Sequence, residues 1–140
     1  MTATQVDSLQ ALIIDDQRSM RMIVKNLLRA IGVEHIAEAA NGKEGLKYLR
    51  NRDMRFPDFI ICDLHMDEMD GMHFCNVVRS DKNLRNQHVP ILVLTGDADK
   101  LLHDVSRQVG AVSVLTKPVS ADVLGSHIEK ALGYAFANGG

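Results

Sequence analysis

Residues 9–16 read LQALIIDD, and this stretch decides the fold because an apolar run ends there in two carboxylates. Three more short apolar runs, rich in branched side chains, follow at 59–62 (FIIC), 91–94 (ILVL) and 112–115 (VSVL). A strand that is covered on both faces needs such a nearly continuous run. The four runs predict strands of a parallel sheet, and the more polar segment 35–39 (HIAEA) predicts a fifth strand at its edge.

Helical patterns alternate with these runs. The first has apolar side chains at helical spacing, which predict one buried face, and they are Met20, Ile23, Val24, Leu27, Leu28 and Ile31. Gly32 is expected to end that helix. Further helices are expected at 43–50, 72–79, 100–109 and 121–136. Five strands alternating with five helices indicate an α/β fold, with a doubly wound five-stranded parallel sheet.

Length and composition limit the class of protein. A chain of 140 residues fits one domain, with a core at about 9–133 between short tails. The net charge is −2 and the basic residues are scattered, which argues against nucleic-acid binding. No apolar run approaches a membrane span and no secretion leader is present, so we expect a cytoplasmic protein. Cys62 and Cys75 lack metal-site spacing and are expected to be buried free thiols.

Polar side chains stand where the predicted strands end: Asp15 and Asp16, then Asp63, then Thr95, and finally Lys117. In open α/β sheets, ligands bind beyond the carboxyl ends of the strands. Three clustered carboxylates repel one another unless a cation joins them, and hard oxygen ligands suit Mg²⁺. An ammonium and a hydroxyl are the groups that stabilise a transferred phosphoryl group. The alternative interpretation is that the aspartates only cap the first helix and a turn.

Four segments in this order carry a family resemblance, and they are IIDDQRSMR (13–21), ICDLHMDEMDG (61–71), LVLTGDA (92–98) and VLTKPVS (114–120). The chain resembles the receiver domains of two-component response regulators over about residues 9–133. The segment after the first strand is most similar to chemotaxis CheY-type and other single-domain receivers. The resemblance implies the strand order 2-1-3-4-5 of the flavodoxin-like fold, for which CheY is a standard example.

The resemblance also implies a role for each site residue. Asp63 would be the phosphoacceptor, attacking a phosphohistidine of a sensor histidine kinase or a histidine phosphotransfer protein. Asp16 would ligate Mg²⁺ directly and Asp15 mainly through water, with Asp63 and the backbone carbonyl of His65 completing the protein ligands. The cofactor implied is therefore Mg²⁺.

Two further residues would contact the phosphoryl group. Lys117 would pair with Asp63 before transfer and with a phosphoryl oxygen afterwards, while Thr95 would bind another oxygen and draw its loop inward. Pro118 resembles the family's cis Lys-Pro bond. Val114 departs from the pattern, because many receivers carry a Tyr or Phe there that rotates on activation.

The resemblance implies a stand-alone, monomeric phospho-accepting switch that catalyses only its own phosphorylation and dephosphorylation. A downstream protein would dock on the fourth helix, the fifth strand and the last helix, and the sequence leaves chemotaxis, stress signalling and relay outputs open. The alternative is a phosphorylation-independent docking module with the same fold. An aspartate-nucleophile phosphatase would need a second Asp where His65 stands, and a nucleotide-binding module would need a Gly-rich loop in place of DDQRS (15–19).

Overall fold

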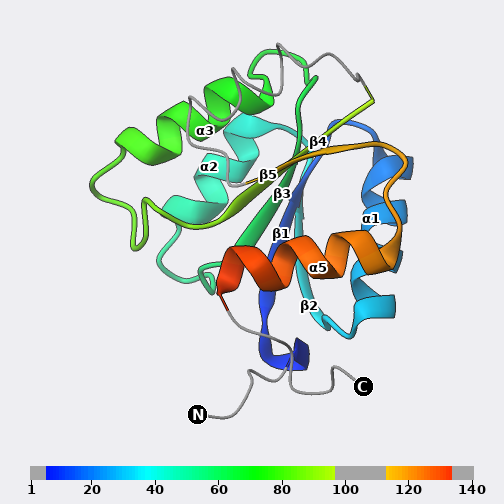
Figure 1. Ribbon diagram of the computed structural model, residues 1–140. Helices are drawn as coiled ribbons and strands as arrows, with labels where there is room; N and C mark the ends of the chain where they lie inside the picture. Colours follow the sequence, from blue (N-terminus) through cyan, green and yellow to red (C-terminus); the bar gives the residue numbers. More distant parts are fainter. Residues whose placement is uncertain (1–5, 97–112, 134–140) are drawn as a thin grey trace.

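The computed structural model of the 140-residue chain describes residues 6–96 and 113–133. Within these residues the strands form one sheet in the order β2-β1-β3-β4-β5, and every neighbouring pair is parallel (Figure 1). This result confirms the α/β class and the strand order. The strands are β1 (Gln10–Ile14), β2 (His35–Ala39), β3 (Phe59–Asp63), β4 (Ile91–Thr95) and β5 (Ser113–Thr116).

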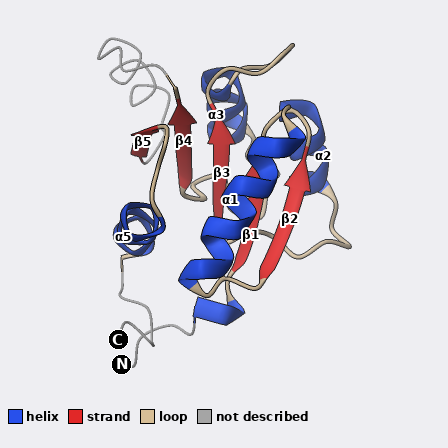
Figure 2. Ribbon diagram, turned by 90° about the vertical axis from the view of Figure 1, so that its right-hand side faces the viewer, coloured by secondary structure: helices blue, strands red, loops and turns tan. Residues whose placement is uncertain are grey.

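Helices cover both faces of this sheet. On one face lie α1 (Arg18–Ile31) and α5 (Ala121–Leu132), and on the other lie α2 (Gly42–Arg50) and α3 (Gly71–Ser80) (Figures 1 and 2). The helix expected at 100–109 and the strand position Val112 lie outside the described residues. The described part of the chain contains no helix that is long and apolar enough to cross a membrane.

The central strands are buried throughout their length, as their apolar runs predict. Every residue of β1, β3 and β4 is buried, whereas β2 and β5, at the two edges, are partly exposed. Successive side chains of a strand point to opposite faces. Leu12 and Ile14 of β1 therefore join the core under α2 and α3, while Ala11 and Ile13 join the core under α1 and α5.

The helix ends follow local sequence signals. Gly32 ends α1 with a φ of 114°, in the left-handed region that favours glycine, and this confirms the predicted boundary. The predicted end of the last helix at Phe136 is wrong, because α5 ends at Leu132 and Gly133 follows with a φ of 83°. The glycine inside the predicted range was the signal for this earlier end.

Two other expectations need correction. The sequence places residues 6–8 in the tail before the core, but Val6–Ser8 form a short 3-10 helix and Val6 is buried against the α1 core. A Cβ on Gly32 would lie 2.8 Å from Val6 Cγ1, so this glycine also leaves room for that contact. Ile23 was assigned to the buried stripe of α1, yet it is 50% exposed because Val24 and Leu28 occupy the face that meets the sheet.

Candidate functional site

The carboxyl ends of the central strands bring the predicted site residues to one edge of the sheet. Asp15 and Asp16 directly follow β1, and Asp63 is the last residue of the neighbouring β3. Thr95 ends β4, where it is fully buried and pairs in register with Thr116 of β5. Four adjacent parallel strands thus deliver their polar termini to the same place, as the topology requires.

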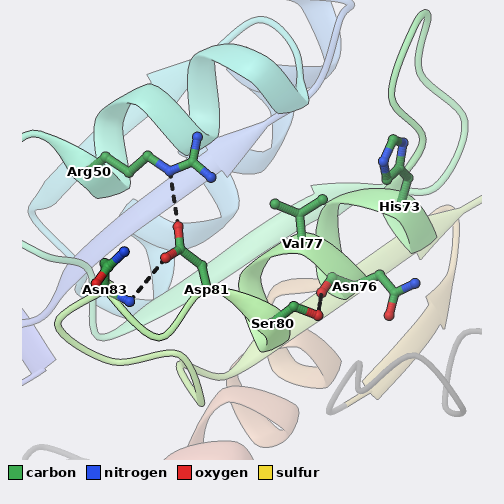
Figure 3. A pocket seen from close by; sticks show the side chains of 7 residues that line it. All are labelled: Arg50, His73, Asn76, Val77, Ser80, Asp81 and Asn83. Atoms are coloured by element: carbon green, nitrogen blue, oxygen red, sulfur yellow. Dashed lines mark hydrogen bonds and ion pairs between the residues drawn. The ribbon is translucent and has the colours of Figure 1, made fainter.

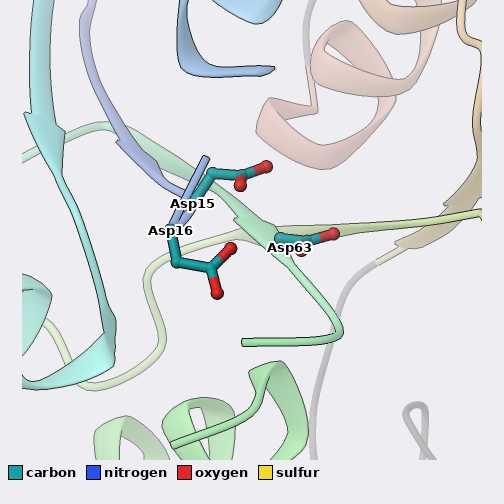
Figure 4. A group of neighbouring side chains, drawn as sticks. All are labelled: Asp15, Asp16 and Asp63. Atoms are coloured by element: carbon teal, nitrogen blue, oxygen red, sulfur yellow. The ribbon is translucent and has the colours of Figure 1, made fainter. Parts of the chain in front are cut away.

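The three aspartates form a compact acidic cluster (Figure 4). One carboxylate oxygen of each of Asp15, Asp16 and Asp63 lies within 4.8 Å of the others. Asp15 is 3% exposed and Asp63 is 8% exposed, while Asp16 is exposed to solvent. The sequence prediction that these side chains come together is therefore confirmed as geometry.

Lys117 supplies the positive charge next to this cluster. Its Nζ donates a hydrogen bond of 2.8 Å to Asp63 Oδ1 and lies 4.0 Å from Asp15 Oδ2. The peptide bond between Lys117 and Pro118 is cis, as predicted. The backbone N–H of Lys117 also donates to the Thr95 carbonyl at 2.7 Å, so β4 and the segment after β5 hold the ammonium over Asp63.

The acidic cluster is short of positive charge. Burial raises the pKa of Asp15, and the neighbouring Asp63 and Asp16 raise it further, against the hydrogen bond from the Gln17 N–H and the charge of Lys117, which both lower it. A raised pKa means that the carboxylate form is disfavoured at this position. Three hard oxygen donors around a common point, two of them buried, fit a small divalent cation such as Mg²⁺.

Capping of a helix does not explain these aspartates. The N-cap of α1 is Gln17, whose side chain makes no capping hydrogen bond, and Asp15 Oδ1 instead accepts the Gln17 N–H at 2.9 Å. The N-cap of α3 is Asp70, which accepts the His73 N–H at 2.8 Å. None of the three aspartates is therefore the N-cap of α1 or α3, although Asp15 closes a turn before α1, as part of the alternative interpretation expects.

The loop after Asp63 turns back closely on its own strand. Gly71 donates its N–H to the Leu64 carbonyl at 2.8 Å, and a Cβ at Gly71 would lie 2.7 Å from the Asp63 carbonyl oxygen. Only glycine permits this approach of α3 to the end of β3. Glu68, in the same loop, has a φ of 68°, which is unusual for a residue with a side chain.

Sequence reasoning missed one residue of this edge. Arg21, on the first turns of α1, donates through Nη1 to the backbone carbonyl of Asp15 at 2.6 Å and pairs with Glu38 of β2. No local motif predicts this contact, because one partner is a backbone atom and the other is in a different element.

The prediction that His65 contributes its backbone carbonyl to a metal site stays a prediction. His65 is exposed in the loop after β3.

A surface hollow of about 630 Å³ lies away from this cluster, between the end of α2 and α3 (Figure 3). Three of its polar side chains are engaged with neighbours: Arg50 pairs with Asp81, and Ser80 donates to the Asn76 carbonyl. The Arg50–Asp81 pair joins α2 to the end of α3, and we assign the hollow no ligand. It is lined by Arg50, His73, Asn76, Val77, Ser80, Asp81 and Asn83.

Comparison with known proteins agrees with this geometry. The family model of the response regulator receiver domain matches residues 11–129, which include the aspartate cluster and Lys117. The chain is a response-regulator receiver domain. Receiver domains are phospho-accepting switches that bind Mg²⁺ at an acidic aspartate cluster. They interact with histidine kinases or phosphotransfer proteins and with downstream targets.

Relatives of this receiver domain cover nearly its whole length. It is 36% identical over 122 residues to the chemotaxis protein CheY of Pseudomonas aeruginosa, covering 87% of this chain and 94% of that protein. It is 33% identical over 130 residues to CheY-3 of Vibrio cholerae, covering 93% and 96%. A solved structure of a putative response regulator from Chloroflexus aurantiacus aligns with a TM-score of 0.80 at 28% identity, covering 89% and 98%.

Val114 stands at the position where the family resemblance leads us to expect a Tyr or Phe. This residue is partly buried on β5, pairs in register with Val93 and packs against the core under α2 and α3.

Cys62 and Cys75 are both buried free thiols, as predicted. Burial raises the pKa of Cys62 well above its ordinary value and that of Cys75 to about 11, so both thiols stay protonated at neutral pH.

Proposed function

We propose that Asp63 accepts a phosphoryl group from a phosphohistidine and that this modification switches the binding of a partner protein. The observation that carries the proposal is the hydrogen bond of 2.8 Å from Lys117 Nζ to Asp63 Oδ1 beside two further carboxylates. A carboxylate at the end of a strand, with an ammonium in contact, can act as a nucleophile toward phosphorus. We propose that this receiver acts through a partner protein in a two-component system or phosphorelay.

In this proposal each residue has a distinct task. An Asp63 oxygen forms a bond to phosphorus, while the bond from phosphorus to the donor imidazole nitrogen breaks and that nitrogen keeps the electron pair. Lys117 neutralises negative charge on the phosphoryl oxygens, and Thr95 offers them its hydroxyl. Asp15 and Asp16 would hold Mg²⁺ together with Asp63 and the His65 carbonyl. The ion, when bound, would neutralise charge on the transferred group.

The downstream partner would bind beside β5 and α5. Val123 on the first turn of α5 is 47% exposed, and β5 is an edge strand of the described sheet. Residues 100–109, which the sequence assigned to the same surface, lie outside the described residues. Because two similar proteins are chemotaxis proteins by name, a chemotaxis partner is the first to test.

Intact-protein mass spectrometry tests the proposal. We expect the wild-type chain to gain one phosphoryl group from acetyl phosphate with Mg²⁺ and none when the metal is chelated. Asp63→Asn keeps the shape but removes the nucleophile, so it should gain none. Asp53→Asn, an exposed aspartate in the loop before β3, is the matched control and should behave as wild type. A wild-type chain that takes up no phosphoryl group would leave only the phosphorylation-independent docking module.

A further inference from the structure

Arg21 connects three elements around the acidic cluster. Its side chain starts on α1, and its Nη1 donates to the carbonyl oxygen of Asp15 at 2.6 Å. Its Nε donates to Glu38 Oε1 of β2 at 3.2 Å. The side chain is only 16% exposed, so the guanidinium is held between the helix, the edge strand and the end of β1.

The Asp15 carbonyl belongs to the peptide group that joins Asp15 to Asp16. The Asp15 N–H donates to the Ala39 carbonyl at 3.2 Å, and its carboxylate accepts the Gln17 N–H at 2.9 Å. With the carbonyl bound by Arg21, each polar group of Asp15 has a fixed partner. Among these contacts, the one from Arg21 is made to the Asp15–Asp16 peptide group itself.

Glu38 in turn holds the guanidinium in place. It pairs with Arg21 and with Lys25, one turn further along α1. Hydrogen bonding to Lys25, and then to Arg21, lowers the pKa of Glu38, so this carboxylate stays ionised at neutral pH. A planar guanidinium can donate to a carboxylate and a carbonyl at the same time, which a single ammonium does less well.

From these contacts we infer that Arg21 is a positioning residue for the cation site, which it serves by fixing the Asp15–Asp16 peptide. The inference rests on the proposed function only in assuming that the cluster binds Mg²⁺. Arg21 acts through the backbone and contacts no reacting atom. Residues that orient metal ligands in this indirect way typically change metal affinity by about 10- to 100-fold when they are replaced.

Lys25 provides a matched control within the same ion-pair group. Both cations bind Glu38, but within the part of the chain that the structure describes only Arg21 of the two also contacts Asp15. Lys25→Gln removes one partner of Glu38 and leaves the Asp15 contact in place. If Arg21 only stabilised the fold, Arg21→Gln and Lys25→Gln would have similar effects on Mg²⁺ affinity.

The experiment is calorimetric titration of the full chain with Mg²⁺, with urea unfolding measured on each variant. We expect Arg21→Gln to weaken Mg²⁺ binding about tenfold and Lys25→Gln to leave it unchanged. Arg21→Met, which keeps the apolar stem but no donor, should weaken binding as well, and it takes the place of the glutamine variant if that one does not fold.

Equal Mg²⁺ affinity in wild type, Arg21→Gln and Arg21→Met would overturn the inference and leave the proposed function intact. Equal losses in Arg21→Gln and Lys25→Gln would also overturn it, because they would trace the effect to Glu38 and general stability. No Mg²⁺ binding by the wild-type chain would instead remove the metal site itself. Phosphoryl uptake is not needed for any of these measurements.

Discussion

Replacing Asp15 with asparagine should make the metal-free protein more stable. The change keeps the shape of the side chain and an oxygen that can accept the Gln17 N–H, but it removes one charge from the cluster. In the folded chain the Asp15 carboxylate is buried, and the oxygens of the three carboxylates lie within 4.8 Å of one another. Removing the charge relieves both the burial of an ion and its repulsion from Asp63.

The size of the gain follows from the surroundings of this carboxylate. Two unit charges 4.8 Å apart, the largest separation of these oxygens, repel by about 3.5 kcal/mol at an effective dielectric constant of about 20. By the same arithmetic the attraction to Lys117, 4.0 Å away, is about 4 kcal/mol, so together with the Gln17 hydrogen bond it offsets the repulsion from Asp63. The net gain then comes from the burial of the Asp15 carboxylate, which is the largest cause of its raised pKa, and from the further repulsion by Asp16. We therefore expect Asp15→Asn to raise the metal-free unfolding free energy by about 1–2 kcal/mol at neutral pH.

The pH dependence gives a second signature. The folded-state pKa of Asp15 is raised above its ordinary value of 3.8, so the folded protein holds this proton more tightly than the unfolded chain does. The wild type consequently loses stability, relative to the variant, as pH rises above that value through the folded pKa. The difference between the two proteins should be smallest in acid and largest at neutral pH.

Urea unfolding followed by circular dichroism measures these differences, since the chain has no Trp. Mg²⁺ at about 100 times its Kd should add about 2.7 kcal/mol to the wild type and much less to Asp15→Asn. Asp53→Asn is the control for loss of an exposed aspartate. A variant that is less stable than wild type without metal, or that gains as much from Mg²⁺, would refute this reasoning.

Three further predictions concern the same edge of the sheet. Gly71→Ala should lower the unfolding free energy by about 1–3 kcal/mol, because the new Cβ meets backbone atoms. Gly96→Ala, whose Cβ would have no atom of the described residues within 4 Å, should not lower it, and urea unfolding of both variants checks this. Glu68→Gly should raise the unfolding free energy by roughly 0.5–1 kcal/mol in the same assay, since glycine adopts the positive φ freely, and a loss would contradict this account of the loop. Lys117→Met should tighten Mg²⁺ binding about tenfold in calorimetry, because the ammonium competes with the cation for Asp63, and it should slow phosphoryl uptake by Asp63. Weaker Mg²⁺ binding by this variant would contradict the competition between Lys117 and the cation.

Much of the fold could be predicted because its signals are local. The apolar runs that end at Ile14 and Cys62 are buried strands, and Gly32 ends α1 as glycine does after many helices. The errors arose where tertiary packing, and not the local sequence pattern, determines whether a side chain is buried. Ile23 fits the helical period but lies outside the face that meets the sheet, and Val6 is a single apolar residue in a polar segment that finds a partner only in the folded chain.

The site residues at strand ends were also predictable, because parallel strands bring their carboxyl ends to one edge. That argument placed Asp15, Asp63 and Lys117 together, and the structure gives their distances. It could not find Arg21, which reaches the site through the Asp15 backbone, or the positive φ of Glu68. Contacts to backbone atoms leave no pattern in the side-chain sequence.

The measurement that bears most directly on the central claim is chemical trapping of the phosphorylated residue. Borohydride reduces an acyl phosphate of aspartate to homoserine, so mass spectrometry of peptides from the treated protein identifies the acceptor. After reaction with acetyl phosphate and Mg²⁺, we expect homoserine at position 63 and at no other aspartate. Homoserine at Asp15, Asp16 or another aspartate, with position 63 unchanged, would contradict the assignment of Asp63 as the phosphoacceptor.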